Sequence, residues 1–280
     1  MTETRTAVER RYVDLSHGRT RYLEAGAGPP VLLLHGAGFT TNADAWLTTL
    51  PALASQFRVL APDFLNWGLG DPFDRELGFA YLADFVREFQ DALGIERSHV
   101  VGHSMGGWVA SLLAYESPQR IDKLVLVASG GMATRNLASM TEFTPPSEAE
   151  IRKLARERAR AAGLDEDALA DEYARQLTRP EVIAAYAKVM RHMTDPLHRP
   201  RYSMARRLPH VKLPTLIVWG ARDQVNDLSM GEATQALIEG SRLVVLDCGH
   251  GVPAEQPAEF QRAVLEFLAG QPVASAARSA

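Results

Sequence analysis

Short apolar runs alternate with helical patterns along most of the chain, and this alternation constrains the fold more than any other feature of the sequence. The inner runs are nearly continuous in Val, Leu and Ile, as expected for parallel strands that helices cover on both faces. We therefore predict an α/β fold with a mostly parallel, doubly wound sheet that starts with an antiparallel hairpin. The predicted strands are Tyr12–Leu15, Thr20–Glu24, Val31–Leu34, Arg58–Ala61, His99–Val101, Lys123–Val127, Thr215–Trp219 and Leu243–Leu246. The predicted helices between them are Phe79–Leu93, Met105–Glu116, Met230–Ile238 and Pro257–Leu268.

The alternation stops in the middle of the chain, where three helix starts follow one another without a strand. Ser147 and Glu150 form a capping box, in which each side chain can bind the backbone of the other residue. Asp165 can cap a second helix, and Thr178 with Pro180 is a start signal for a third. Three successive helices indicate a cap that covers the carboxyl ends of the strands; ordinary crossover helices are the alternative.

The predicted organisation is a discontinuous α/β core with a helical insertion. Residues 1–130 and 210–270 form the core, and residues 131–209 form the cap. Residues 271–280 are small and polar, so we expect a disordered tail. With 280 residues, of which 46% are hydrophobic and 23% charged, the chain can bury a substantial core without disulfides or metals.

Charge and cysteine content exclude several classes of protein. The net charge of −4 argues against nucleic acid or an anionic membrane as a partner. Cys248 is the only cysteine, which excludes an internal disulfide and a cysteine-based zinc site. The first residues lack the apolar stretch of a secretory signal, and no apolar run approaches the roughly 20 residues of a membrane helix. We expect a soluble, cytoplasmic protein, monomeric or homodimeric, that acts on a small molecule.

The motif GHSMGG at residues 102–107 is the strongest chemical signal. It directly follows the strand His99–Val101 and precedes a helix. A G-x-S-x-G motif in this context predicts a nucleophile elbow, a tight turn that presents the serine in a strained backbone conformation. Small residues on either side allow the strand and the helix to approach closely. Ser104 is therefore the predicted nucleophile.

The serine needs a base that accepts its proton and a carboxylate that orients this base. His250 follows the last predicted strand, at the edge where the carboxyl ends of parallel strands gather. His103 adjoins Ser104, but the tight turn should direct its side chain away from the hydroxyl. Asp223, which follows the preceding strand, is the expected carboxylate, with Asp247 as its rival. The chain order of nucleophile, acid and base also matches a hydrolase triad.

A glycine-rich loop, HGAG at residues 35–38, follows the third predicted strand. Glycines there let backbone amides turn toward a substrate, although a plain glycine turn is the alternative. The N–H groups of Ala37 and Met105 are the candidates for an oxyanion hole, and Met105 begins the helix after the elbow. We expect a mostly apolar substrate pocket. The residues predicted to line it are Gly38, Phe39, Trp67, His103 and Trp108; for Trp67, packing on the rim of the sheet is equally compatible.

The chain resembles the α/β-hydrolase superfamily over nearly its whole length. The resemblance rests on HGAG, GHSMGG, LIVWGARD at residues 216–223 and CGH at residues 248–250, together with a PD-x-G-type loop from residue 62. That loop is about two residues longer than is usual in the family. The resemblance implies the α/β-hydrolase fold and a triad of Ser104, Asp223 and His250, with no metal or organic cofactor.

Two kinds of capped hydrolase are similar to this chain. Residues Ser129–Met132 resemble those of C–C hydrolases that cleave vinylogous 1,5-diketones formed by ring cleavage. Those enzymes commonly have Asn where this chain has His103, and Trp where it has Gly251, whereas GHSMGG is equally typical of carboxylesterases. We predict a serine hydrolase that cleaves a small to medium carboxylic ester. C–C bond hydrolysis is one alternative, and a ligand-binding protein of this fold with little turnover is another.

Overall fold

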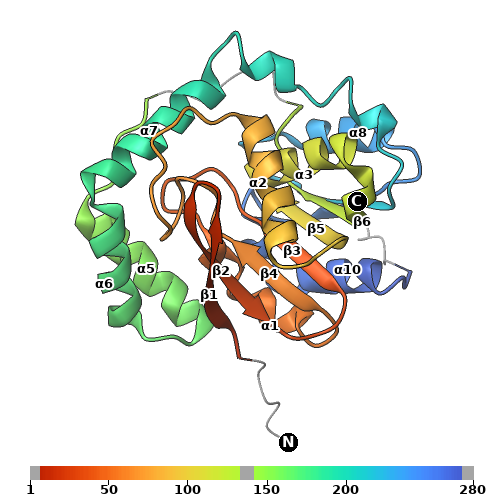
Figure 1. Ribbon diagram of the computed structural model, residues 1–280. Coiled ribbons are helices and arrows are strands. Elements are labelled where there is room, and N and C mark those ends of the chain that lie inside the picture. Colours follow the sequence, from red (N-terminus) through yellow and green to blue (C-terminus); the bar gives the residue numbers. More distant parts are fainter. Residues whose placement is uncertain (1–6, 133–141, 273–280) are drawn as a thin grey trace, which may run out of the picture.

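The computed structural model describes residues 7–132 and 142–272, and it contains a twisted eight-stranded sheet with helices on both faces (Figure 1). The strands are β1 (Glu9–Leu15), β2 (Gly18–Ala25), β3 (Pro30–Leu34), β4 (Arg58–Pro62), β5 (Ser98–His103), β6 (Ile121–Val127), β7 (Thr215–Gly220) and β8 (Arg242–Leu246). Their order in the sheet is β1-β2-β4-β3-β5-β6-β7-β8. β2 pairs antiparallel with β1 and β4, and the other neighbours pair in parallel. All the predicted strands and the antiparallel start are confirmed.

Side chains of the central strands alternate between two apolar cores. In β3, Leu32 and Leu34 belong to one core, and Val31 and Leu33 belong to the other. The first core contains α2 (Phe79–Ala92), α3 (Met105–Glu116) and α8 (Leu228–Leu237); the second contains α1 (Leu50–Leu53) and α10 (Pro257–Leu268). All four predicted core helices are present. The single turns η1 (Ala43–Trp46), α1, η2 (Pro118–Arg120) and α9 (Val252–Glu255) were not predicted, because one turn shows no helical period.

Three helices lie between β6 and β7 in the chain, in the region where the alternation of the sequence stops. They are α5 (Glu148–Ala162), α6 (Glu166–Leu177) and α7 (Pro180–Thr194), followed by the short turns η3 (Arg199–Tyr202) and η4 (Leu208–His210). We call residues 147–210 the helical insertion. In Figure 1 its helices lie along the side of the sheet near β1 and β2, where Glu172 of α6 pairs with Arg10 of β1.

Two of the predicted helix starts are confirmed. The hydroxyl of Ser147 accepts a hydrogen bond from the N–H of Glu150, whose carboxylate accepts one from the N–H of Ser147 at 2.8 Å. Asp165 accepts hydrogen bonds from two N–H groups in the first turn of α6. Both helices therefore begin where the capping residues indicate.

The third helix begins at Pro180, as the proline predicts, but Thr178 does not cap it. Thr178 ends α6, and its hydroxyl donates to the carbonyl of Ala174 at 2.7 Å. The extended residue that precedes α7 is Arg179. The cause is Pro180, because a proline ring disfavours a helical backbone in the residue immediately before it.

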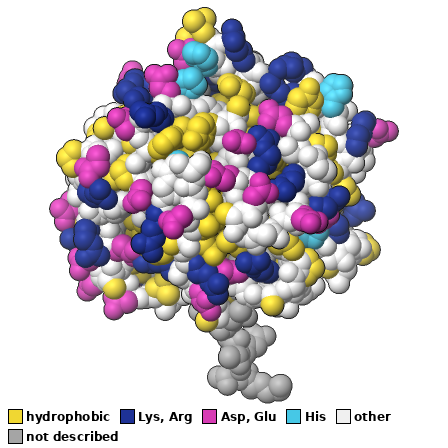
Figure 2. Space-filling view, in the orientation of Figure 1, with side chains coloured by type: hydrophobic (Ala, Val, Ile, Leu, Met, Phe, Trp, Pro, Cys, Tyr) yellow, Lys and Arg dark blue, Asp and Glu magenta, His cyan; other side chains and the backbone are white. Residues whose placement is uncertain are grey.

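Parts of two predicted segments lie outside the described residues. These are residues 133–141 of the predicted cap and residues 273–280 of the predicted tail. No helix within residues 7–132 and 142–272 is long and apolar enough to cross a membrane. In Figure 2, acidic and basic side chains are interspersed over the visible face.

Arg21 of β2 is fully buried, which the sequence did not indicate. Its Nε donates to Asp63 and its Nη2 donates to Asp44, both at 2.9 Å. Asp63 directly follows β4 and Asp44 lies in η1 after β3, so one guanidinium joins the loops that follow two strands. Burial opposes the charge of Arg21, but the two carboxylates outweigh burial and raise its pKa well above the ordinary value.

Replacing Arg21 with Met should lower the free energy of unfolding by about 3–5 kcal/mol, because two carboxylates would stay buried without a counter-charge. Urea denaturation followed by circular dichroism measures this loss. Arg19→Met is the matched control, since Arg19 is exposed on the same strand, and its effect should stay below about 1 kcal/mol. Equal effects of the two substitutions would contradict the role of the buried cluster.

Candidate active site

Ser104 lies in the turn between β5 and α3 with a backbone φ of 54°, in the left-handed region that residues with a Cβ avoid. Its N–H donates to the carbonyl of Val127 and its carbonyl accepts from Gly130, both at 2.9 Å. Two glycines allow the close packing around it. A Cβ on Gly102 would lie 2.4 Å from the carbonyl oxygen of Gly106, and a Cβ on Gly106 would lie 2.2 Å from a carbonyl oxygen of β3. The small residues of the motif are therefore a steric requirement.

Three side chains from separate loops form a continuous series of hydrogen bonds. His250 Nε2 lies 3.0 Å from Ser104 Oγ, and His250 Nδ1 lies 2.8 Å from Asp223 Oδ2. The second carboxylate oxygen of Asp223 accepts the N–H groups of Val225 and Asn226 at 2.8 and 2.9 Å. Burial alone would raise the pKa of Asp223, but these hydrogen bonds lower it below the ordinary value. With Nδ1 donating to a carboxylate, Nε2 is the nitrogen that can accept the serine proton.

The rival carboxylate, Asp247, is exposed and pairs with Arg222. The loop around the histidine is held by Glu255 of α9 instead. The Glu255 oxygens accept the N–H groups of Gly249 at 2.7 Å and Gly251 at 2.9 Å. A Cβ on Gly251 would lie 2.9 Å from an oxygen of the same carboxylate, so a larger residue after the histidine would have to displace the Glu255 side chain.

Two further histidines brace the site. His103 Nε2 donates to the carbonyl of His250 at 2.8 Å. His35 is fully buried; its Nδ1 donates to the carbonyl of Gly36 at 2.8 Å, and its Nε2 accepts the N–H of Phe64 at 2.9 Å. Burial lowers the pKa of His103 and of His35 to about 4, so both rings are neutral at pH 7.

The predicted oxyanion donors belong to two different elements. Met105 is the first residue of α3, and the first N–H groups of a helix have no partner within the helix. Ala37 lies in the loop after β3 and lines the same cavity as Ser104. The Ala37 carbonyl accepts the Trp67 indole N–H at 2.9 Å and the Tyr186 hydroxyl at 2.8 Å, so this loop is held from two sides.

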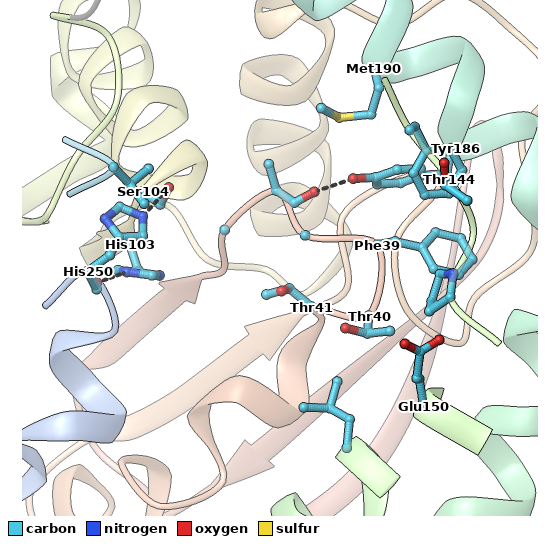
Figure 3. Close-up of a pocket in the computed structure, with 17 residues that line it drawn as sticks. Phe39, Thr40, Thr41, His103, Ser104, Thr144, Glu150, Tyr186, Met190 and His250 are labelled. Atoms are coloured by element: carbon cyan, nitrogen blue, oxygen red, sulfur yellow. Dashed lines mark hydrogen bonds between the residues drawn. The ribbon is translucent and has the colours of Figure 1, made fainter. Parts of the chain in front are cut away.

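A cavity of about 660 Å³ reaches Ser104 and His250. In Figure 3, these residues lie at one end of the cavity, and Phe39, Tyr186 and Glu150 lie at the other. None of the described residues that line it is a lysine or arginine, and no cluster of described side chains is suited to hold a metal ion. The lining residues are 36–41, His103, Ser104, Phe143, Thr144, Pro146, Glu150, Leu154, Tyr186, Met190, Val225 and His250.

Of the residues expected to line the pocket, Gly38, Phe39 and His103 lie on the cavity wall, whereas Trp67 and Trp108 do not. The prediction for the two tryptophans is therefore corrected. Both rings are buried, and both indole N–H groups donate to backbone carbonyls.

Each tryptophan packs between elements that are distant in sequence. Trp67 lies edge-on to the ring of Tyr186 in α7, with ring centroids 5.6 Å apart. Trp108 stacks on Phe79 of α2, with centroids 3.8 Å apart, and its N–H donates to the carbonyl of Tyr202 at 2.8 Å. Both rings therefore pack against other elements of the fold and do not line the cavity.

The sequence did not assign Leu154, Tyr186 and Met190 to the cavity wall. They come from α5 and α7. Tyr186 and Met190 are four residues apart, a helical spacing that indicates one buried face. The spacing does not say against which surface that face is buried.

Comparison with known proteins identifies the class. Residues 29–257 match the family model for the α/β hydrolase fold. The chain is 33% identical over 265 residues to 2-hydroxymuconate semialdehyde hydrolase of Pseudomonas sp. (strain CF600), covering 90% of each chain. It is also 33% identical over 267 residues to 2-hydroxy-6-oxo-2,4-heptadienoate hydrolase of Pseudomonas putida, covering 90% of this chain and 93% of the relative.

A solved structure shows the same architecture. The 2-hydroxy-6-oxo-6-phenylhexa-2,4-dienoate hydrolase from Rhodococcus sp. strain RHA1 matches with a TM-score of 0.78 and 25% identity, over 94% of this chain and all of the other. The chain therefore belongs to the α/β-hydrolase family and is a hydrolase that acts on a small molecule.

Replacing Asp223 with Asn should lower kcat by roughly 10³–10⁴-fold near pH 7, because the imidazole would lose its tautomer and its charge partner. Asp247→Asn is the control and should change kcat little, since this carboxylate is exposed. Turnover of an activated ester and the melting temperature are measured for both variants. The reverse ranking would assign the role to Asp247.

Acid should destabilise the protein partly through His103. Its pKa is about 4 in the folded state and about 6.5 in the unfolded chain. Between these pH values only the unfolded state binds the proton, so the free energy of unfolding decreases as the pH is lowered. Gln at position 103 has an amide N–H that extends about as far as Nε2 and can donate to the His250 carbonyl, but it cannot titrate. The loss of unfolding free energy from pH 7 to pH 5 should therefore be about 1–2 kcal/mol smaller in His103→Gln. Urea denaturation at both pH values tests this, and identical losses would refute it.

Proposed function

We propose that this protein is a serine hydrolase that cleaves neutral carboxylic esters with a small to medium apolar acyl group. The observation that supports this most directly is the series of hydrogen bonds from Asp223 through His250 to Ser104 at the end of a mostly apolar cavity. The family membership of the chain supports the same class of reaction.

In the proposed mechanism, Ser104 Oγ attacks the ester carbonyl carbon while His250 Nε2 accepts its proton. The N–H groups of Ala37 and Met105 stabilise the negative charge that develops on the carbonyl oxygen. His250 then donates the proton to the departing alkoxide, which leaves an acyl-enzyme and an alcohol. His250 next activates water, which releases the carboxylic acid and restores the serine. Asp223 stabilises the imidazolium in both halves of the reaction.

The charge of the cavity supports a neutral acyl group. The names of several related hydrolases denote dienoates, which are carboxylate anions. Among the described residues that line the cavity of this chain, Glu150 adds negative charge and no lysine or arginine offsets it. A carboxylate that enters a mostly apolar site loses hydration, and no cationic side chain among the described lining residues compensates for this loss.

Hydrolysis of a C–C bond in a vinylogous diketone is the second candidate. The observation in its favour is the 33% identity to 2-hydroxymuconate semialdehyde hydrolase over 90% of both chains. The departures at His103 and Gly251 from the residues common in such enzymes count against it. Both reactions would use the same nucleophile and base, so the substrate decides between them.

Two esters that differ in charge test the proposal. We expect kcat/KM for p-nitrophenyl pentanoate to exceed that for p-nitrophenyl hemisuccinate by at least about tenfold, which corresponds to about 1.4 kcal/mol. Glu150→Gln should raise kcat/KM for the hemisuccinate more than kcat/KM for the pentanoate.

Ser104→Ala should lower kcat/KM for both esters by about 10⁴-fold or more, with an unchanged melting temperature.

The remaining outcomes separate the alternatives. A vinylogous diketone that is hydrolysed at least about tenfold better than the best ester would make the C–C hydrolase the correct assignment. If neither class reacts but a fluorophosphonate labels Ser104, the substrate lies outside both. Absence of labelling would indicate a binding protein without a working nucleophile.

A further inference from the structure

Each of the three helices of the insertion sends one polar side chain to the loop that follows β3. We call residues 35–44 the β3 loop; it contains Ala37, the proposed oxyanion donor. The side chains are Arg158 from α5, Tyr173 from α6 and Tyr186 from α7. The insertion therefore holds the loop that completes the active site at three points.

Of the three side chains, Tyr186 is the one that binds Ala37, the proposed oxyanion donor. Its hydroxyl donates to the Ala37 carbonyl at 2.8 Å, and a dashed line at Tyr186 marks this bond in Figure 3. The Trp67 indole donates to the same oxygen at 2.9 Å from the core side. Burial raises the pKa of Tyr186 well above its ordinary value, so the hydroxyl keeps its proton at neutral pH. One donor from the insertion and one from the core thus fix the position of this carbonyl.

The other two contacts hold the far half of the β3 loop. Arg158 Nη1 donates to the carbonyl of Thr40 at 2.6 Å, and the Tyr173 hydroxyl donates to Asp44 Oδ2 at 2.8 Å. Asp44 also accepts Arg21 at 2.9 Å. The loop is therefore tied to the buried ion cluster on one side and to the insertion on the other.

We propose that the helical insertion positions the Ala37 N–H for stabilisation of the oxyanion, and that Tyr186 is the positioning residue through which it acts. This inference rests on the proposed serine-hydrolase function. The Ala37 carbonyl belongs to the rigid peptide plane that joins Ala37 to Gly38, and the Ala37 N–H is linked to this plane through the Ala37 Cα. Holding the plane at its carbonyl therefore restricts how far the Cα and its N–H can move. A displacement of about 1 Å in a catalytic group can lower a rate by about 10²-fold.

The ring of Tyr186 also faces the cavity in which the substrate would bind. It lines the cavity and packs against Phe39 and Phe143, with ring centroids 5.0 and 4.7 Å away. An acyl group in the far end of the cavity would therefore touch the same side chain whose hydroxyl holds the β3 loop. Contacts with this acyl group would then raise kcat as well as improve binding.

Tyr186→Phe keeps the ring and removes the hydroxyl. We expect the rate at which a fluorophosphonate labels Ser104 to fall by about tenfold, which is less than the roughly 10²–10³-fold loss of a whole oxyanion donor. The kcat for p-nitrophenyl pentanoate should fall in parallel, while its KM and the melting temperature stay nearly unchanged. Trp67→Phe removes the other donor to the same carbonyl and should lower the labelling rate in the same way. Tyr81→Phe is the matched control, because Tyr81 is 37% exposed on α2 and should have no effect.

An unchanged labelling rate in Tyr186→Phe would overturn the inference. So would a higher KM with an unchanged kcat, because Tyr186 would then only shape the cavity. If the labelling rate falls but no ester is hydrolysed, the inference stands and the proposed substrate class fails. If Ser104 of the wild-type protein is not labelled at all, both fail.

Discussion

The guanidinium of Arg21 lies in the interior between the carboxylates of Asp44 and Asp63, and the loops that follow β3 and β4 meet around this charge. A buried charge is tolerated only with counter-charges and hydrogen bonds close by. The cluster supplies both, since Asp63 also accepts two backbone N–H groups and Asp44 also accepts the hydroxyl of Tyr173. The β3 loop therefore has a defined position relative to the sheet before any substrate binds. Without this cluster, the glycine-rich segment around Ala37 would lose its main anchor in the core.

The second constraint is the strained turn at Ser104. Its left-handed backbone is maintained because β3, β5 and α3 pack so closely that Gly102 and Gly106 leave no room for a Cβ. The turn places the hydroxyl beside the histidine and the N–H of Met105 at the start of a helix. Rigid packing of the sheet thus provides the proposed nucleophile and one proposed oxyanion donor, whereas the second donor depends on a loop that the insertion also holds.

The helical insertion contributes side chains to the cavity. Tyr186 and Met190 of α7 and Leu154 of α5 form much of the cavity wall that lies away from the serine. The proposed triad would act at a carbonyl carbon, and this wall would determine which carbonyl compound fits. None of the described residues of the wall is a lysine or arginine, which supports the proposed neutral ester over the carboxylates named for the relatives.

Local and periodic information in the sequence was sufficient to predict the strands, most helix starts and the three side chains that form the hydrogen-bonded series. Asp223 could be distinguished from Asp247 because Asp223 lies in the loop beyond its strand, whereas Asp247 adjoins the last residue of β8, where reaching the imidazole is harder. The burial of Arg21 and the packing of Trp67 and Trp108 could not be predicted in this way. Their partners come from segments distant in the chain, and periodicity shows that a side chain is buried without showing what it is buried against. Only the tertiary structure brings those segments together, because their contacts are stabilised by packing and charge pairing between distant elements, which no local pattern in the sequence shows.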